Sequence, residues 1–167
     1  LAVGHRFGPA ALLVGHSLGG AAASVAMAHG LEAERVVLIA PAADPVAATE
    51  RFATIIALPQ RLWRGLIASF ERHVGVRFDD LQAQNTAPCI ARPALIVHDV
   101  EDREVPWSEG ERYARYWSDS RLLSTRGLGH NRIAGDDRVI TAALRFLHGE
   151  AIGERVVSSP NLPYGFA

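Results

Sequence analysis

The sequence carries the stretch Gly15-His16-Ser17-Leu18-Gly19-Gly20 between two segments of different pattern. Before it, residues 11–14 form a short continuous apolar run, which is typical of a strand buried on both faces. After it, residues 21–29 are rich in alanine and end at Gly30, which is typical of a helix and its C-terminal stop. The sequence therefore predicts a sharp turn from a buried strand into a helix, with Ser17 at the turn.

This turn has the G-x-S-x-G spacing of a nucleophile elbow. Such a turn strains the backbone of the serine and brings the chain close to the residues on either side, so we expect Gly15 and Gly19 to be required. Ser17 Oγ would then be exposed at the end of the strand, and the Leu18 N–H would point to a developing oxyanion. The stretch contains no lysine and lacks P-loop spacing, which excludes a phosphate loop of that kind.

Strand and helix patterns alternate along the rest of the chain. Buried-strand patterns recur at 35–39 and 94–98, and a weaker one lies at 121–124. Helices are predicted at 108–117, with Ser108 as N-cap, and at 137–147. This order predicts the α/β class, as three α/β/α layers around a mostly parallel sheet.

Residues 42–87 interrupt the alternation, because they show helical patterns and no convincing strand. We interpret them as a helical cap over the carboxyl ends of the strands. The predicted organisation is core segments at 1–41 and 88–150, the cap at 42–87 and a loosely held tail at 151–167. One face of the predicted cap helix at 61–70 is apolar and consists of Leu62, Trp63, Leu66, Ile67 and Phe70.

A serine hydroxyl is a poor nucleophile at neutral pH, so it needs a base and the base needs an orienting partner. The base is predicted to be His130, because the preceding glycines let its loop fold inward; the alternative is a hydrogen-bonded loop histidine. Asp102 is the preferred partner, since Val105-Pro106 anchors the return of its loop. Asp99 is second and Glu101 third, and the alternative is that all three are solvated loop acids.

Three motifs, G-H-S-L-G-G at Ser17, H-D-V-E-D-R-E-V-P at Asp102 and G-L-G-H at His130, resemble the α/β-hydrolase fold superfamily over residues 10–148. The likeness is to small bacterial serine hydrolases and esterases with a compact helical cap. The resemblance implies cleavage of a small ester or thioester through an acyl-enzyme, with no metal and no cofactor. It also implies further strands before the elbow, and a second oxyanion donor from that half.

Residues 1–10 supply neither of these, so we expect the chain to be the C-terminal half of such a fold, incomplete as an enzyme and with the elbow strand at an open edge. Two other classes of function stay open. The first is a non-catalytic binding domain with a relic triad. The second is a C–C bond hydrolase or a cofactor-free peroxidase that uses the same triad.

The residues expected to contact the substrate are His16, Trp63 and Phe70. His16 is next to the nucleophile, but its side chain should point away and support the elbow. The cap aromatics Phe52, Trp63 and Phe70, together with Leu66, predict an apolar pocket for an acyl or alkyl group, unless they only attach the cap to the body. The arginines of the cap are balanced by nearby carboxylates, which favours a solvated mixed surface over an anion site.

The composition excludes several classes of partner. The net charge of −1 over 167 residues gives no electrostatic reason to expect a nucleic acid or an anionic membrane. No apolar run approaches the roughly 20 residues that span a bilayer. The single cysteine, Cys89, cannot form an internal disulfide, which favours a reducing, cytoplasmic location.

Overall fold

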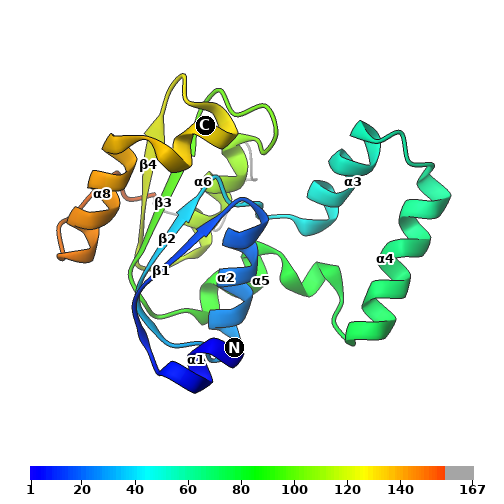
Figure 1. Ribbon diagram of the computed structural model, residues 1–167, viewed down its shortest axis with the longest axis horizontal. Helices are drawn as coiled ribbons and strands as arrows, with labels where there is room; N and C mark the ends of the chain where they lie inside the picture. The colour runs from blue at the N-terminus through cyan, green and yellow to red at the C-terminus, as the bar shows by residue number, and fades with distance from the viewer. Residues whose placement is uncertain (157–167) are drawn as a thin grey trace.

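The computed structural model describes residues 1–156 and has one sheet at its centre (Figure 1). Its four strands are all parallel and lie side by side in the order of the sequence. They are β1 (Ala10–His16), β2 (Ala33–Ile39), β3 (Ala94–Asp99) and β4 (Ser120–Thr125). The four predicted strands are confirmed, and β1 is an edge strand.

Helices cover both faces of this sheet. On one face α2 (Leu18–Ala28) and α6 (Trp107–Tyr116) pack against alternate strand residues such as Val36 and Leu38. On the other face α8 (Asp137–Leu147) packs against the intervening residues, Val37 and Ile39. Each fully buried valine, leucine or isoleucine contributes roughly 1.5–3 kcal/mol relative to an exposed one. The predicted three-layer α/β fold is therefore confirmed.

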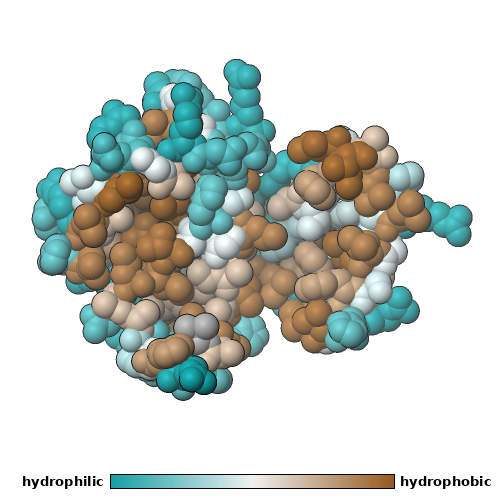
Figure 2. All heavy atoms as spheres, in the orientation of Figure 1, coloured by the Kyte–Doolittle hydropathy of each residue, from teal (hydrophilic) through white to brown (hydrophobic). Residues whose placement is uncertain are grey.

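Residues 42–87 contain α3 (Pro45–Ile55), α4 (Gln60–Val74), η1 (Phe78–Leu81) and α5 (Ala83–Thr86), and η2 (Ala87–Cys89) follows. Asp44 caps α3 by accepting a hydrogen bond from the Ala47 N–H at 3.0 Å. Figure 1 shows α3 and α4 as a hairpin beside the sheet, and α4 has no buried residue. Figure 2 shows apolar surface over this hairpin and over the region of β1.

Three short elements complete the fold: α1 (Ala2–Phe7), α7 (Gly129–Arg132) and η3 (Ile133–Gly135). Two helices begin earlier than the sequence predicts. The first, α2, begins at Leu18, because the turn passes directly into the helix. In α6 the N-cap is Pro106 and not Ser108, since a proline can precede a helix without losing a hydrogen bond.

The predicted loose tail differs from the structure in its first part. Glu154 pairs with Leu122 of β4 through two backbone hydrogen bonds of 2.7 and 2.8 Å, and Ile152 is buried. Residues 151–156 are therefore attached to the second edge of the sheet, while 157–167 lie outside the described residues. None of the helices in residues 1–156 has the length and apolar character needed to cross a membrane.

Candidate active site

Ser17 lies at the turn between β1 and α2, with φ 56° and ψ −127°. A side chain rarely tolerates a positive φ, which costs about 1–3 kcal/mol. A Cβ atom on Gly15 would lie 2.7 Å from the Gly19 carbonyl oxygen, so the prediction for Gly15 is confirmed. The prediction for Gly19 is wrong, since no described atom other than its chain neighbours and the backbone of its own helix lies within 4 Å of a Cβ there. The second tight position is Gly20, whose Cβ would lie 2.9 Å from Pro41 Cβ.

Three side chains from distant segments are joined by hydrogen bonds at the carboxyl end of the sheet. Ser17 Oγ lies 2.9 Å from His130 Nε2, and His130 Nδ1 lies 2.7 Å from Asp102 Oδ2. With the His130 proton on Nδ1, which this network favours, Nε2 is free to accept the serine proton. His130 is nearly buried on α7, and the Asp102 side chain is fully buried in the loop after β3. This geometry allows His130 to act as a general base toward Ser17.

The carboxylate of Asp102 is oriented by its own loop. Its Oδ1 accepts hydrogen bonds from the Glu104 and Val105 N–H groups, both at 2.9 Å. This leaves Oδ2 for His130, and the buried His98 Nε2 lies 3.4 Å from the same oxygen. The Val105-Pro106 segment therefore fixes the carboxylate as well as the return of the loop.

The two other candidate acids have different partners. Glu101 forms an exposed ion pair with Arg126 at 3.1 Å. Asp99 is fully buried, and it accepts hydrogen bonds from Glu101 N, Thr125 Oγ1 and Leu128 N. Burial opposes its charged form, but the hydrogen bonds together outweigh burial and hold the pKa of Asp99 below its ordinary value. No hydrogen bond within residues 1–156 joins either acid to His130.

His16 contacts the histidine of this site and not the serine hydroxyl. Its Nε2–H donates to the His130 carbonyl oxygen at 2.9 Å, and the two rings lie 4.9 Å apart. The His16 side chain therefore holds the backbone of His130, while the Ser17 hydroxyl contacts the His130 ring from the turn after β1.

A cavity of about 690 Å³ opens beside Ser17 and His130. Its apolar lining comes from the elbow, the Asp102 loop and α3, and includes Leu18, Phe52, Ile55 and Val105. Arg51 also lines it, but pairs with the buried Glu109 at 2.9 Å. The sequence did not single out the α3 residues as substrate contacts, although Phe52 belongs to the cap aromatics that predicted an apolar pocket.

Trp63 and Phe70 lie outside the lining of this cavity. Trp63 Nε1 donates to Thr49 Oγ1 at 3.3 Å, and Thr49 is itself part of the lining. Phe70 packs edge-on against Phe78, with ring centres 5.1 Å apart. It lines a second, apolar cavity of about 560 Å³ between α2 and α4, which shares Leu18 and Thr49 with the first.

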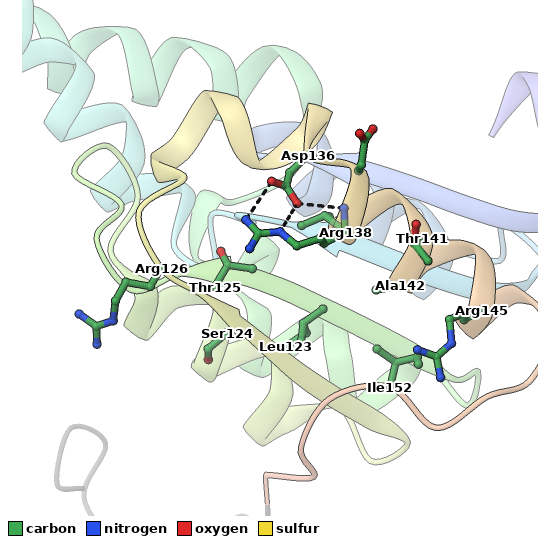
Figure 3. A pocket seen from close by; sticks show the side chains of 12 residues that line it. Leu123, Ser124, Thr125, Arg126, Asp136, Arg138, Thr141, Ala142, Arg145 and Ile152 are labelled. Carbon is green, nitrogen blue, oxygen red and sulfur yellow. Dashed lines mark hydrogen bonds and ion pairs between the residues drawn. The ribbon is translucent and has the colours of Figure 1, made fainter.

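A third cavity, of about 700 Å³, lies between β4 and α8 (Figure 3). Its arginines are paired, as Figure 3 shows for Arg138 and Asp136 at 3.1 Å. None of the residues that line it belongs to the Ser17 site. In residues 1–156 there is also no group of three or more His, Cys, Asp or Glu side chains that could hold a metal ion.

The elbow presents a backbone N–H that has no acceptor inside its own helix. Leu18 is the first residue of α2, so its N–H has no acceptor inside the helix, and the helix dipole favours negative charge there. The helix α1 precedes the seven residues of β1 and lies at the opposite end of the strand. Because a strand rises about 3.3 Å per residue, roughly 20 Å separates residues 1–8 from Ser17. Those residues provide no second donor.

No protein-family model matches the sequence, and a search of curated proteins finds no match. Solved structures match well. BpoC of Mycobacterium tuberculosis H37Rv, which carries the name of a non-heme bromoperoxidase, is 18% identical, with a TM-score of 0.62 over 84% of this chain and 68% of that one. The metagenomic α/β hydrolase MGS-MChE2 from lagoon sediments of Mar Chica, Morocco, is 17% identical, with a TM-score of 0.59 over 83% of this chain and 61% of that one.

The esterase domain of a Rhodothermus marinus protein is 18% identical, with a TM-score of 0.58 over 86% of this chain and 64% of that one. The chain therefore spans about two thirds of the length of these three proteins. At such identities the likeness concerns the path of the backbone alone. The chain has the α/β-hydrolase fold.

Proposed function

We propose that this chain carries the nucleophile, base and acid of a serine hydrolase that cleaves a small carboxylic ester or thioester. The observation that carries the proposal is the hydrogen-bonded series from Ser17 through His130 to Asp102, with distances of 2.9 and 2.7 Å. A buried carboxylate is costly unless it is paired. A purely binding domain gains nothing from keeping Asp102 buried behind a histidine that faces a strained serine.

In the proposed reaction, His130 Nε2 removes the proton of Ser17 Oγ as the oxygen attacks the carbonyl carbon. Asp102 holds the proton on Nδ1 and stabilises the imidazolium that forms. His130 then gives its proton to the leaving alcohol or thiol, and an acyl-enzyme remains. Water attacks this ester with His130 as base again, which releases the acid and restores Ser17.

The Leu18 N–H is the proposed first donor to the oxyanion. Loss of one such donor typically costs about 10²–10³ in rate. We infer that full activity needs a second donor from outside residues 1–156. In the α/β-hydrolase fold this donor is expected from the half that precedes the elbow. Within this chain the expected result is an activated serine with slow turnover.

The proposed substrate is a small ester or acyl compound whose apolar group lies against Leu18, Phe52 and Ile55, in the cavity beside Ser17. In this proposal residues 42–87 act as the cap, and Trp63 contributes indirectly by holding Thr49. His16 and Phe70 do not line this cavity, so in this proposal neither of them contacts the reacting group of the substrate. The exposed free thiol of Cys89 supports the expected cytoplasmic location.

Labelling with a fluorophosphonate, read by intact mass, tests the proposal. The probe reacts with an activated serine, so we expect one adduct on the wild-type chain, none on Ser17→Ala, and a large loss of rate in His130→Ala. Ser124→Ala is a matched control, because Ser124 is an exposed serine that bonds Trp107 Nε1 at 3.0 Å outside the site. Labelling that persists in Ser17→Ala, or a folded chain that takes no label, would contradict the proposal.

A further inference from the structure

The buried carboxylate of Asp99 lies beside the proposed triad without belonging to it. Its Oδ1 accepts from the Glu101 N–H at 3.0 Å, and its Oδ2 accepts from Thr125 Oγ1 at 2.8 Å and from the Leu128 N–H at 3.0 Å. The side chain has no exposure to solvent, and these donors keep it ionised despite its burial. A buried charge of this kind requires that every donor stays in place.

Two of these donors, the Glu101 and Leu128 N–H groups, come from the two loops that carry the acid and the base, and the third, Thr125, ends β4. Glu101 directly precedes Asp102, and Leu128 lies two residues before His130. The pairing of β3 with β4 ends at Asp99 and Thr125, so no strand ladder connects the loops beyond that point. The loop before His130 also contains Gly127 and Gly129, both with positive φ, which gives its backbone unusual freedom.

The Val100 N–H donates to the Thr125 carbonyl at 2.9 Å as the last bond of the strand pairing, and the other side-chain links between the loops lie at the surface. Arg126 pairs with Glu101 at 3.1 Å and Asn131 donates to Glu104 at 2.8 Å, and both contacts are exposed. Exposed pairs of this kind contribute about 0–1 kcal/mol. Within residues 1–156, the side-chain link that is both buried and independent of His130 is the carboxylate of Asp99.

We propose that Asp99 is a positioning residue, whose carboxylate fixes the Asp102 loop against the His130 loop and so sets the hydrogen bond between Asp102 and His130 Nδ1. This inference rests on the proposed function and deepens it, because it assigns a second acid to the same site. Asparagine cannot replace the side chain, since all its partners are donors and one amide N–H would face another donor.

The test compares Asp99→Asn with the pair Thr125→Val and Thr125→Ser. Valine removes one donor and keeps the shape of threonine, while serine keeps the hydroxyl. Because a misplacement of about 1 Å can cost roughly 100-fold in rate, we expect fluorophosphonate labelling to fall about 10- to 100-fold in Asp99→Asn and less in Thr125→Val. Thr125→Ser should label at nearly the wild-type rate.

The second readout is the tautomer of His130, taken from nitrogen–proton correlation spectra of the ring. We expect the Nδ1–H form in the wild type and in Thr125→Ser, and a mixture of tautomers in Asp99→Asn and Thr125→Val. Ser120→Ala is the stability control, because it removes a buried hydroxyl bonded to the Ala114 and Trp117 carbonyls at the far end of β4. This variant should lose stability and keep the wild-type tautomer.

Folded Asp99→Asn and Thr125→Val chains with the wild-type tautomer would overturn the proposal. So would a labelling loss in Ser120→Ala as large as that in Asp99→Asn, because the effect would then follow stability alone. A wild-type chain that takes no label contradicts the proposed function instead. The tautomer of His130 still decides on Asp99 in that case, so the two failures are distinguishable.

Discussion

The strained backbone of Ser17 is held by hydrogen bonds on both sides. Its N–H donates to the Ile39 carbonyl at 2.9 Å, and its carbonyl accepts from Gly20 N at 2.9 Å and Ala42 N at 3.4 Å. Two of these partners lie at and beyond the end of β2, so the neighbouring strand fixes the serine. This explains how a residue with φ 56° keeps its hydroxyl within 2.9 Å of His130.

Substitution of Gly15 and Gly19 by alanine should have opposite outcomes. In Gly15→Ala the new methyl group would overlap the backbone of Gly19 and Gly20, which cannot move without shifting Ser17. We expect a loss of about 1–3 kcal/mol in the free energy of unfolding, and a slower reaction of Ser17 with the fluorophosphonate. In Gly19→Ala the methyl group meets open space in the first turn of α2, so stability should be unchanged or rise by less than about 1 kcal/mol.

Urea unfolding of the two variants, with the labelling rate measured alongside, checks this prediction. The glycines are four residues apart in one motif, so each variant serves as the control for the other. Equal losses of stability in both would show that the close approach at Gly15 does not limit the turn.

At the scale of the elements, the strands were predictable because burial on both faces leaves continuous apolar runs such as 35–39 and 94–98. The helices of the hairpin were predictable only in part. The apolar face of α4 is present in the sequence, but Leu62 and Leu66 on it are 59% and 65% exposed. A periodic pattern identifies the face of a helix and does not identify what covers it.

The same limit applies to the site. That Ser17, Asp102 and His130 come together was predictable, because each follows a recognisable strand and the carboxyl ends of parallel strands share one edge of the sheet. The lining by Phe52 and Ile55 was not, since it depends on how α3 turns away from β2. The buried hydrogen bonds of Asp99 could not be predicted either, because its donors Thr125 and Leu128 lie more than 25 residues away in the sequence.

The contact between β3 and α6 predicts a dependence of stability on pH. His98 on β3 is fully buried against Gly110 of α6, and burial lowers its pKa in spite of the nearby carboxylates of Asp102 and Glu109. The folded chain therefore holds neutral His98, with Nε2–H donating to the Val105 carbonyl at 3.0 Å. Unfolding frees the histidine to bind a proton below its ordinary pKa of about 6.5.

Between the lowered pKa of folded His98 and about 6.5, the unfolded state therefore binds more protons than the folded state. The free energy of unfolding has its full value above this pH range and decreases as the pH falls through it. The loss should approach about 1.4 kcal/mol per pH unit for one such group. Urea unfolding from neutral to acidic pH should show this slope in the wild type and a smaller one in His98→Gln, which can still donate to Val105. An unchanged slope in His98→Gln would assign the effect to other groups.

At the scale of the whole molecule, the two edges of the sheet differ. The edge at β4 is partly covered by the antiparallel pairing of Glu154 with Leu122. The edge at β1 has no neighbour in residues 1–156, and its seven residues include the half-exposed Val14. An unpaired strand offers a row of N–H and C=O groups to any other strand, and an apolar surface beside it favours that contact.

We therefore expect the 167-residue chain to self-associate through β1 as its concentration rises, with sedimentation velocity as the measurement. Val14→Lys should shift the chain toward the monomer, because a charge on an edge strand must lose solvent when two strands pair. The matched control is Leu144→Lys on α8, since Leu144 is 52% exposed against 53% for Val14 and lies on a helix, which offers no unpaired strand edge. Equal dissociation by both variants would mean that general surface hydrophobicity drives the association. A selective effect of Val14→Lys would identify β1 as the edge of the sheet that accepts a further strand.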